Sequence, residues 1–554
     1  MKYNDINNLY QLFSYQNDEN PEKKIFFQKI GQEWQGFSFK NINLKISLIQ
    51  KFLLQRKIKK GDRVFLLSNS CVDWVAIDLA IQSVGGVTVP AFTTNNNSDN
   101  KFIITDCTPK LIFIENSELF KKNENILKNL KKKIIFINPF EDNLSLKEIY
   151  SQTPLKLCLP SVSKDDLSCI IYTSGTYNNP KGVMLPHKAV LHNCEAAFDR
   201  LKDLGFKNEV FLSFLPLSHS YERMAGIYFP ISIGAKVFFV KKIENIMSDF
   251  KEVKPTIVNG VPRFYQNLYK KVFSNIKHFN EEFSKKLLTS VNNSNQGNFL
   301  QSLIFKIILN FLKFKIKKIF GGNIKVFISG GAALDSFISN FFLKFDLHII
   351  QGYGQTESGP LISCNSLKNN NPESVGFPVK DVKVKINKTH EILVTGPNLM
   401  RGYWGLDSLT KKTLIKNWLY TGDLGKFDIE GRLIITGRKK ELIVTSGGEN
   451  ISPQKIENLF SVYSEITNCI VYGDSKPYLI AIFFTEKKIG HKTVRKIVNE
   501  VNSKISSIER IRSFIVSHEL LTVDNGLITG TYKVRKEKLF KKFKKEIDKL
   551  YPSL

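Results

Sequence analysis

The apolar positions of this chain fall into short runs that end abruptly in loops rich in glycine and serine. Runs of this kind lie at residues 169–172, 325–328 and 348–350. Repeated strand, loop and helix patterns predict an α/β architecture with a substantial parallel sheet. Because ligands bind beyond the carboxyl ends of strands in open α/β sheets, the three loops predict one composite ligand site.

The chain has 554 residues, several times the usual size of a single domain. A strand pair ends near residues 437–440, and a new αβ pattern begins there. We therefore expect a large N-terminal domain of stacked αβ layers over residues 1–438 and a small α+β C-terminal domain over residues 439–554. The Asn-, Ser- and Lys-rich stretch at 275–298 predicts a surface excursion.

The net charge is unusual, although the hydrophobic content of 42% is typical of a globular protein. The chain carries 80 Lys and Arg against 51 Asp and Glu, a formal charge of +29 that is spread along its length. This excess is consistent with binding to polyanions such as a nucleotide, coenzyme A or an anionic membrane. Compositional drift is the favoured explanation, because Lys, Asn, Ile and Phe, which all have AT-rich codons, are all abundant. No nucleic-acid-binding motif accompanies the basic stretches, so no nucleic acid partner is expected.

The cysteines and histidines indicate neither a disulfide framework nor a zinc site. The 7 cysteines are dispersed without a Cys-x-x-Cys pair, and the 8 histidines show no metal-ligand spacing. The polar N-terminus does not resemble a signal peptide, and no uncharged apolar run is long enough for a transmembrane helix. These features predict a cytoplasmic protein.

The most specific segment spans residues 172–182 and reads Tyr-Thr-Ser-Gly-Thr-Tyr-Asn-Asn-Pro-Lys-Gly, directly after a predicted strand. Hydroxyl groups, glycine amides and a lysine supply the many donors and the positive charge that a polyphosphate requires. The Gly-Lys-[Ser/Thr] ending of a P-loop is absent. The segment resembles the phosphate-binding signature of the adenylate-forming superfamily, which includes acyl-CoA synthetases, firefly luciferase and peptide-synthetase adenylation domains. It departs from that signature at Tyr177 and Asn178, where relatives usually have Thr or Ser and Gly.

Other segments match the same superfamily in the same order over nearly the whole chain. Residues 215–223, Leu-Pro-Leu-Ser-His-Ser-Tyr-Glu-Arg, and residues 260–263, Gly-Val-Pro-Arg, are particularly similar to the long-chain fatty acyl-CoA synthetases. The resemblance places His219 beside the acyl group, as a candidate catalytic residue. Taken alone, a single histidine after a strand is more often structural.

The resemblance also implies how the nucleotide is bound. Residues 329–334, Ser-Gly-Gly-Ala-Ala-Leu, would lie against adenine, and the Tyr-Gly-x-Thr-Glu segment at 353–357 would supply Tyr353 to stack on adenine and Thr356 to hold the α-phosphate. Glu357 offers a hard oxygen ligand to Mg²⁺, with Thr173 near the metal. Asp423 and Arg438 would bind the ribose. The candidate ATP-binding residues are Thr173, Ser174, Gly175, Thr176, Lys181, Gly330, Gly331, Ala332, Gln351, Gly352, Tyr353, Thr356, Asp423 and Arg438.

The C-terminal segments resemble the family's small, mobile domain. Lys440 aligns with the hinge about which that domain rotates between two half-reactions. Gly447 and Gly448 fall in a loop that contacts coenzyme A in relatives. Residues 527–533, Leu-Ile-Thr-Gly-Thr-Tyr-Lys, resemble the terminal segment that carries the catalytic lysine, which makes Lys533 the candidate.

The resemblance implies a ligase that joins a carboxylic acid, most specifically a long-chain fatty acid, to coenzyme A through an acyl-adenylate, at the expense of ATP and with Mg²⁺. An acyl-AMP ligase for another carboxylate or for a carrier protein, and a luciferase-like oxygenase, share the first half-reaction. A non-catalytic nucleotide-binding relative would be expected to lose Lys533 or Glu357, and both are present.

Residues 303–320 combine apolar and basic side chains. They fit an amphipathic helix in the interface of a membrane, where a fatty acid would be found, which would put the protein peripherally on the inner face of that membrane. They also fit a helix packed on the large domain with its lysines outward.

Overall fold

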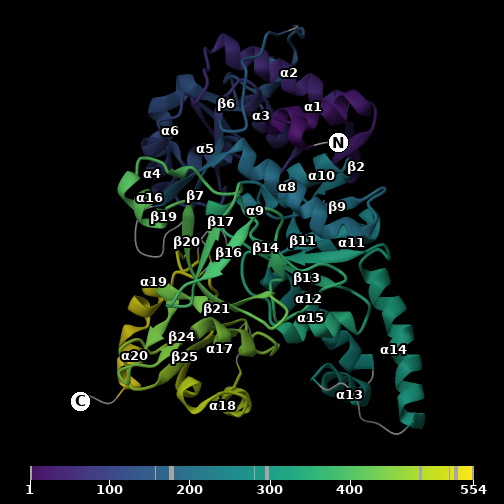
Figure 1. Cartoon of the computed structure of the whole chain (residues 1–554), viewed down its shortest axis with the longest axis vertical. Coiled ribbons are helices and arrows are strands. Elements are labelled where there is room, and N and C mark those ends of the chain that lie inside the picture. The colour runs from purple at the N-terminus through teal and green to yellow at the C-terminus, as the bar shows by residue number, and fades with distance from the viewer. Residues whose placement is uncertain are drawn as a thin grey trace.

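The computed structural model describes residues 3–155, 157–173, 180–279, 281–292, 299–485, 489–522, 525–528 and 534–551. Within these ranges helices and strands alternate, and the inner strands of the two largest sheets pair mostly in parallel (Figure 1). This confirms the predicted α/β fold class, with a large N-terminal part and a smaller C-terminal part. The predicted strands are found as β7 (Leu167–Thr173), β12 (Val326–Ser329) and β13 (Ile349–Tyr353).

The larger of the two main sheets has nine strands in the order β15-β14-β13-β12-β11-β9-β10-β1-β2. Strands β13 through β1 along this order are parallel, and the outer pairs are antiparallel. Besides β12 and β13, the strands are β1 (Lys24–Ile30), β2 (Glu33–Ser38), β9 (Val210–Ser213), β10 (Lys236–Phe239), β11 (Ile257–Gly260), β14 (Ser363–Cys364) and β15 (Phe377–Pro378).

The second main sheet has seven strands in the order β18-β8-β7-β4-β3-β5-β6. Its central strands are buried along nearly their whole length, which is why they read as largely continuous apolar runs instead of alternating patterns. Besides β7, the strands are β3 (Arg63–Leu67), β4 (Val87–Ala91), β5 (Leu111–Ile114), β6 (Ile134–Phe136), β8 (Lys181–Pro186) and β18 (Gly402–Tyr403).

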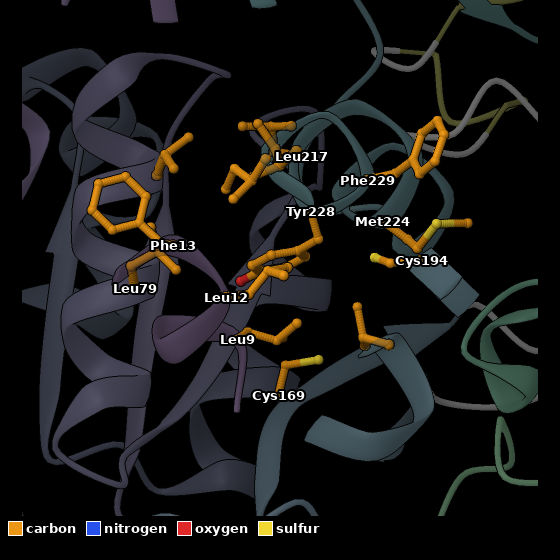
Figure 2. Packing of buried hydrophobic residues seen from close by; sticks show 14 of the residues in the cluster. Leu9, Leu12, Phe13, Leu79, Cys169, Cys194, Leu217, Met224, Tyr228 and Phe229 are labelled. Carbon is orange, nitrogen blue, oxygen red and sulfur yellow. The ribbon is translucent and has the colours of Figure 1, made fainter. Parts of the chain in front are cut away.

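Helices between the two sheets complete the main core. α3 (Val72–Ser83) is buried on all sides and therefore lacks an amphipathic pattern. Figure 2 shows Phe13 of α1 (Leu9–Glu19) beside Leu79 of α3, and Leu12 of α1 beside Tyr228. The other helices of this layer are α2 (Phe39–Gln55), α8 (His187–Leu201), α9 (Ser220–Glu222), α10 (Phe229–Ser232) and a π-helical turn, η4 (Arg223–Tyr228).

The outer face of the nine-stranded sheet is covered by α11 (Ile246–Val253), α12 (Pro262–Phe279), α14 (Phe299–Ile319) and α15 (Ser336–Leu343), with α13 (Glu281–Asn292) packed on α12. The stretch at 275–298, expected as a surface excursion, thus contains the end of α12 and all of α13, and Ile276, Phe283 and Leu287 in it are buried. Around β4 and β5 lie α4 (Asn97–Cys107), α5 (Ser117–Lys122) and α6 (Glu124–Leu127), and α7 (Leu146–Tyr150) packs on α2.

A third sheet links the N-terminal part to the C-terminal part. It contains β16 (Lys383–Ile386), β17 (Glu391–Thr395), β19 (Leu414–Ile415), β20 (Trp418–Phe427) and β21 (Leu433–Arg438), with α16 (Asp407–Thr413) before β19. The chain then makes a 3-10 turn at Lys439–Glu441 and continues into β22 (Ile443–Val444), β23 (Asn450–Ile451), α17 (Pro453–Phe460), β24 (Asn468–Tyr472), β25 (Leu479–Phe484), α18 (His491–Asn502), β26 (Ile511–Ser517), α19 (Lys536–Lys542) and α20 (Lys544–Lys549). Strands β24, β25 and β26 carry two apolar clusters of their own, one on each face.

Candidate active site

One large cleft, with a volume of about 2180 Å³, opens where β7, β12 and β13 end. Its walls come from segments far apart in the sequence, from Pro90 in the seven-stranded sheet to Phe540 in α19. The carboxyl ends of parallel strands expose loop backbone and polar side chains at one edge, which is where ligands bind in such sheets. The structure therefore brings together the three loops from which a composite site was predicted.

One side of the cleft lies on the antiparallel pair of β7 and β8. Thr173, at the end of β7, lies directly opposite Lys181, at the start of β8, and both line the cleft. Ser174, Gly175 and Thr176 of the predicted phosphate loop lie outside the described residues. Burial lowers the pKa of the Lys181 ammonium; the Glu357 carboxylate opposes this effect and Lys440 adds to it. Lys181 is thus a half-buried cation that faces a carboxylate across the cleft.

Glu357 is held by an aromatic residue that the sequence analysis did not single out. The Tyr403 hydroxyl donates to Glu357 Oε1 at 2.9 Å, and the Lys181 ammonium lies 5.1 Å from the centre of the Tyr403 ring. Burial, together with the Glu357 charge, raises the pKa of Tyr403, so the phenol stays a neutral donor. An ionised carboxylate has about four acceptor positions, so this bond leaves Glu357 able to bind a cation.

The donor set around Glu357 suits Mg²⁺ better than a soft metal. Among the described residues no group of three or more His, Cys, Asp or Glu side chains could hold a metal ion. Mg²⁺ is usually bound through one or two carboxylates plus substrate phosphates and water, so the single carboxylate of Glu357 fits it. Thr356 lies next to Glu357, and its hydroxyl is 3.1 Å from the Ser220 hydroxyl.

Asp423 is the best organised carboxylate of the cleft. The Tyr353 hydroxyl donates to Asp423 Oδ2 at 2.8 Å, and Arg438 Nε donates to Oδ1 at 2.7 Å. Burial and the Asp423 charge raise the pKa of Tyr353 well above its usual range, which keeps the hydroxyl protonated. Asp423 and Arg438 are direct partners in the pairing of β20 with β21, so the sheet fixes their spacing. A carboxylate that accepts hydrogen bonds from two donors still has free lone pairs, which can accept from the two hydroxyl groups of a diol.

The glycines after β12 let backbone lie against the cleft. A Cβ at Gly330 would come within 3.0 Å of the Tyr221 ring, and Gly331 has a φ of +83°, which favours glycine. Gly330, Gly331 and Ala332 all line the cleft, as does Gly352 in β13.

The side chain of Gln351 plays a different part from the one predicted. It is buried, accepts a hydrogen bond from the Leu334 amide at 3.0 Å and donates to the Pro372 carbonyl at 2.6 Å. It does not appear among the residues that line the described part of the cleft. Gln351 therefore ties the loop after β12 to the sheet.

Beyond His219 the cleft becomes apolar. His219 lines the cleft, and its Nδ1 accepts from the Tyr221 amide at 3.2 Å, which caps α9. The largely apolar part is lined by Ala197, Leu201, Met224, Ala225, Phe229, Leu361, Cys364 and Val375, and Arg200 of α8 also lines the cleft. Met224, Cys194 and Phe229 lie close together in Figure 2, where the π-helical turn meets α8. This chamber can hold an uncharged, largely hydrocarbon group.

A buried ion pair holds the π-helical turn that forms one wall of this chamber. Arg223 donates to both oxygens of Asp78, at 2.6 and 3.1 Å, and the two side chains are 3% and 1% exposed. Tyr228 also donates to Asp78. Burial raises the pKa of the neighbouring Glu222 to about 8. The Ser213 hydroxyl donates to Glu222 Oε1 at 2.6 Å, which partly opposes this rise. The Glu-Arg pair noted in the sequence is thus part of the core behind the cleft.

The C-terminal part closes the cleft on one side. Lys533 lies outside the described residues, but the five residues that follow it, from Val534 to Lys538, line the cleft. Arg535 donates to Asp99 of α4 at 3.2 Å, an ion pair between the two parts of the chain. Lys440 is exposed at the cleft wall. Gly447 and Gly448 are not among the described residues that line it.

Sequence reasoning missed Tyr403, Asp99 and Arg535. Tyr403 sits in a Gly-Tyr-Trp-Gly run, where the glycines around two aromatic residues were the only signal. Asp99 and Arg535 are separated by 436 positions, so nothing local marks them as a pair.

Two family models cover most of the chain. Residues 13–404 match the AMP-binding enzyme model, and residues 440–554 match the AMP-binding enzyme C-terminal domain. The chain belongs to the AMP-binding enzyme family. The Long-chain-fatty-acid–CoA ligase FadD15 of Mycobacterium bovis is 27% identical over 98% of this chain and 96% of its own length. Long-chain-fatty-acid–CoA ligase 5 of Mus musculus is 30% identical over 95% of this chain and 86% of its own.

Solved structures of two other CoA-ligating enzymes share the fold. The anthranilate CoA ligase AuaEII, in complex with anthranoyl-AMP, superimposes with a TM-score of 0.79 at 19% identity, covering 97% of this chain and 98% of that one. The o-succinylbenzoate CoA synthetase of Bacillus subtilis, with its acyl-adenylate intermediate, gives a TM-score of 0.73 at 18% identity, covering 95% and 97%. These likenesses establish the fold of both parts of the chain.

Proposed function

We propose that this AMP-binding enzyme is a long-chain fatty acid–CoA ligase, which converts a fatty acid, ATP and coenzyme A to acyl-CoA, AMP and diphosphate through an acyl-adenylate. The observation that carries the proposal is one continuous cleft with an ordered Tyr353–Asp423–Arg438 group at one end and an apolar chamber beyond His219 at the other. The names of the relatives support the choice of a fatty acid over an aryl acid.

The first half-reaction needs positioning and charge more than a nucleophilic side chain. Asp423 and Arg438 would hold the ribose, Thr356 the α-phosphate, and Lys181 with the loop at 174–179 the leaving diphosphate. Mg²⁺, when bound at Glu357 with Thr173 near it, neutralises charge on the phosphate oxygens. A fatty acid carboxylate whose chain lies in the apolar chamber meets the α-phosphorus beside His219, and Lys533 supplies a positive charge between the two anions.

The second half-reaction would use the C-terminal domain, proposed here as residues 439–554, in another orientation. Gly447 and Gly448 are not among the described residues that line the cleft in this structure. Rotation about Lys440 would remove the segment after Lys533 from the cleft and bring this glycine loop to it, to line the path of the coenzyme A thiol. The thiol then attacks the acyl-adenylate and AMP leaves.

The test is AMP release over carboxylic acids from acetate to long-chain fatty acids, with ATP, Mg²⁺ and coenzyme A. The highest kcat/KM is expected for long-chain acids, with acyl-CoA identified by mass spectrometry. If the long-chain acids are not preferred, the acid assignment is wrong. Acyl-AMP that accumulates without acyl-CoA would favour the alternative, an acyl-AMP ligase that feeds a carrier protein.

Lys533→Ala tests the assignment of the lysine. The variant is expected to lose ATP–diphosphate exchange while it still forms acyl-CoA from supplied acyl-adenylate. Lys541→Ala, at an exposed lysine of α19, is the matched control and should retain both activities. Unchanged exchange in Lys533→Ala would refute the role.

We propose also that the protein is peripheral on the inner face of a membrane, which it contacts through residues 303–320. This segment covers most of α14. In the described part of the chain no helix is both long and apolar enough to cross a membrane. A surface contact would give access to an acid that partitions into lipid.

A further inference from the structure

Helix α14 carries apolar side chains on two opposite faces. Leu312 and Ile316 point into the core of the large domain, where they are 5% and 3% exposed. Ile307, Phe311 and Phe314 are instead 62%, 48% and 68% exposed. At 100° per residue these three positions fall on the side of the helix away from Leu312 and Ile316. The helix therefore packs on the large domain through one face and leaves apolar side chains exposed on the other.

The exposed apolar face, formed by Ile307, Phe311 and Phe314, is a continuous stripe. Its members are four and three residues apart, so their side chains are neighbours over two helical turns, about 10 Å along the axis. Figure 1 shows α14 as a long helix at the edge of the molecule, extending away from the two main sheets. A helix that packs on a domain normally presents polar residues to water, and a stripe of large apolar side chains there marks an interaction surface.

The charged side chains of α14 itself are all positive. α14 contains five lysines and no Asp or Glu. Lys313 and Lys317 pair with Asp346 of the large domain, at 3.2 and 3.7 Å. The other three are Lys306, Lys315 and Lys318, and all are exposed. The Lys315 ammonium lies 4.4 Å from the centre of the Phe311 ring, so charge and apolar surface occupy the same face.

We infer that the exposed apolar face docks into the headgroup region of an anionic membrane, with Lys306, Lys315 and Lys318 against the lipid phosphates. A helix that lies in a membrane interface combines apolar side chains with flanking lysines. The free energy of apolar burial and that of attraction to anionic headgroups then both favour binding. Long lysine side chains can keep their ammonium groups at the phosphates while their stems cover apolar surface.

A second copy of this chain is the poorer occupant. A twofold interface on this face would bring the same patch from two molecules together and oppose the lysines of one helix to those of the other, with no carboxylate on either helix to compensate. An anionic bilayer supplies the opposite charge along the whole stripe. This inference deepens the proposed membrane contact and does not depend on which acid the enzyme activates.

The test is cosedimentation of the full chain with vesicles of phosphatidylcholine alone or mixed with phosphatidylglycerol, without substrate. Binding is expected only to the mixed vesicles and should weaken with salt. Phe311→Ser with Phe314→Ser should weaken it at least tenfold, and Lys306→Gln, Lys315→Gln and Lys318→Gln should each weaken it about fivefold. Ile429→Ser, at a side chain that is 101% exposed outside α14, is the matched control and should bind like the wild type.

Equal binding of the double phenylalanine variant and the wild type would overturn the inference, as would the absence of binding to the mixed vesicles. A concentration-dependent dimer that the phenylalanine substitutions abolish would assign the face to a second copy instead. AMP release with a water-soluble acid should be unchanged in the vesicle-binding variants. Loss of vesicle binding with intact ligase activity therefore separates this inference from the proposed reaction.

Discussion

Replacing Arg223 by methionine removes one member of a buried ion pair and leaves the other in the core. The wild-type guanidinium donates to both oxygens of Asp78, and both side chains are almost fully buried. Methionine is long enough to occupy most of the same space, so the main effect is electrostatic. Asp78 retains the Tyr228 hydroxyl as a donor but loses its only described cationic partner.

The expected cost follows from the burial of the remaining charge. Breaking a buried pair by removing one partner costs about 3–5 kcal/mol, because the uncompensated carboxylate must stay desolvated or take up a proton. Typical domains are stable by only about 5–15 kcal/mol, so a large fraction of the stability would be lost. Replacing both partners, as Asp78→Leu with Arg223→Met, should recover all but about 1–2 kcal/mol. The residual cost reflects the acceptor that Tyr228 loses.

Urea unfolding followed by tryptophan fluorescence measures both variants. Trp74 is fully buried 6.0 Å from the Arg223 guanidinium and reports on this region. Met224 and Ala225 follow Arg223 in the chamber wall, so the single variant should also discriminate less between acids of different length. A loss of stability below about 1 kcal/mol in Arg223→Met, or a double variant no more stable than the single one, would refute the reasoning.

Three further predictions concern groups around the cleft. The pKa of Glu222, about 8, lies above its ordinary value of 4.5, so the folded state holds a proton that the unfolded state releases. The free energy of unfolding should therefore fall by about 1.4 kcal/mol per pH unit as pH rises between these two values. Glu222→Gln should remove that slope, as measured by urea unfolding at pH 5 and pH 8. An unchanged slope would contradict the assignment. Tyr403→Phe deletes the hydrogen bond to Glu357 and should raise the Mg²⁺ concentration for half-maximal activity about fivefold. A Mg²⁺ titration of activity measures this, and an unchanged half-maximal concentration would contradict the prediction. Asp99→Asn weakens the ion pair with Arg535, and both side chains are about a quarter exposed, so the effect should be modest. ATP–diphosphate exchange should slow by no more than about fivefold, while thioester formation from acyl-adenylate keeps its rate. Equal slowing of both reactions would show that the pair does not favour the orientation of the C-terminal part used in the first half-reaction.

The sequence alone was sufficient for the fold class, the strand ends that meet at the cleft and the family. These features depend on local order: apolar runs predict strands, and glycine- and hydroxyl-rich segments predict the loops that follow them. Asp423 and Arg438 could be assigned together because each lies in a matching motif, and the pairing of β20 with β21 then puts them in contact.

The tertiary structure decided what local order cannot express. Tyr403 reaches Glu357 across 46 positions, and Arg535 reaches Asp99 across 436, since such contacts depend on how sheets and helices pack. Gln351, in a matching motif, turned out to tie the loop after β12 to the sheet, because its side chain lies on the buried side of β13. For α14 the sequence determined a helix with apolar and basic residues. Only packing decided which apolar face is buried and which meets the solvent, because burial depends on the neighbouring elements and not on the helix alone.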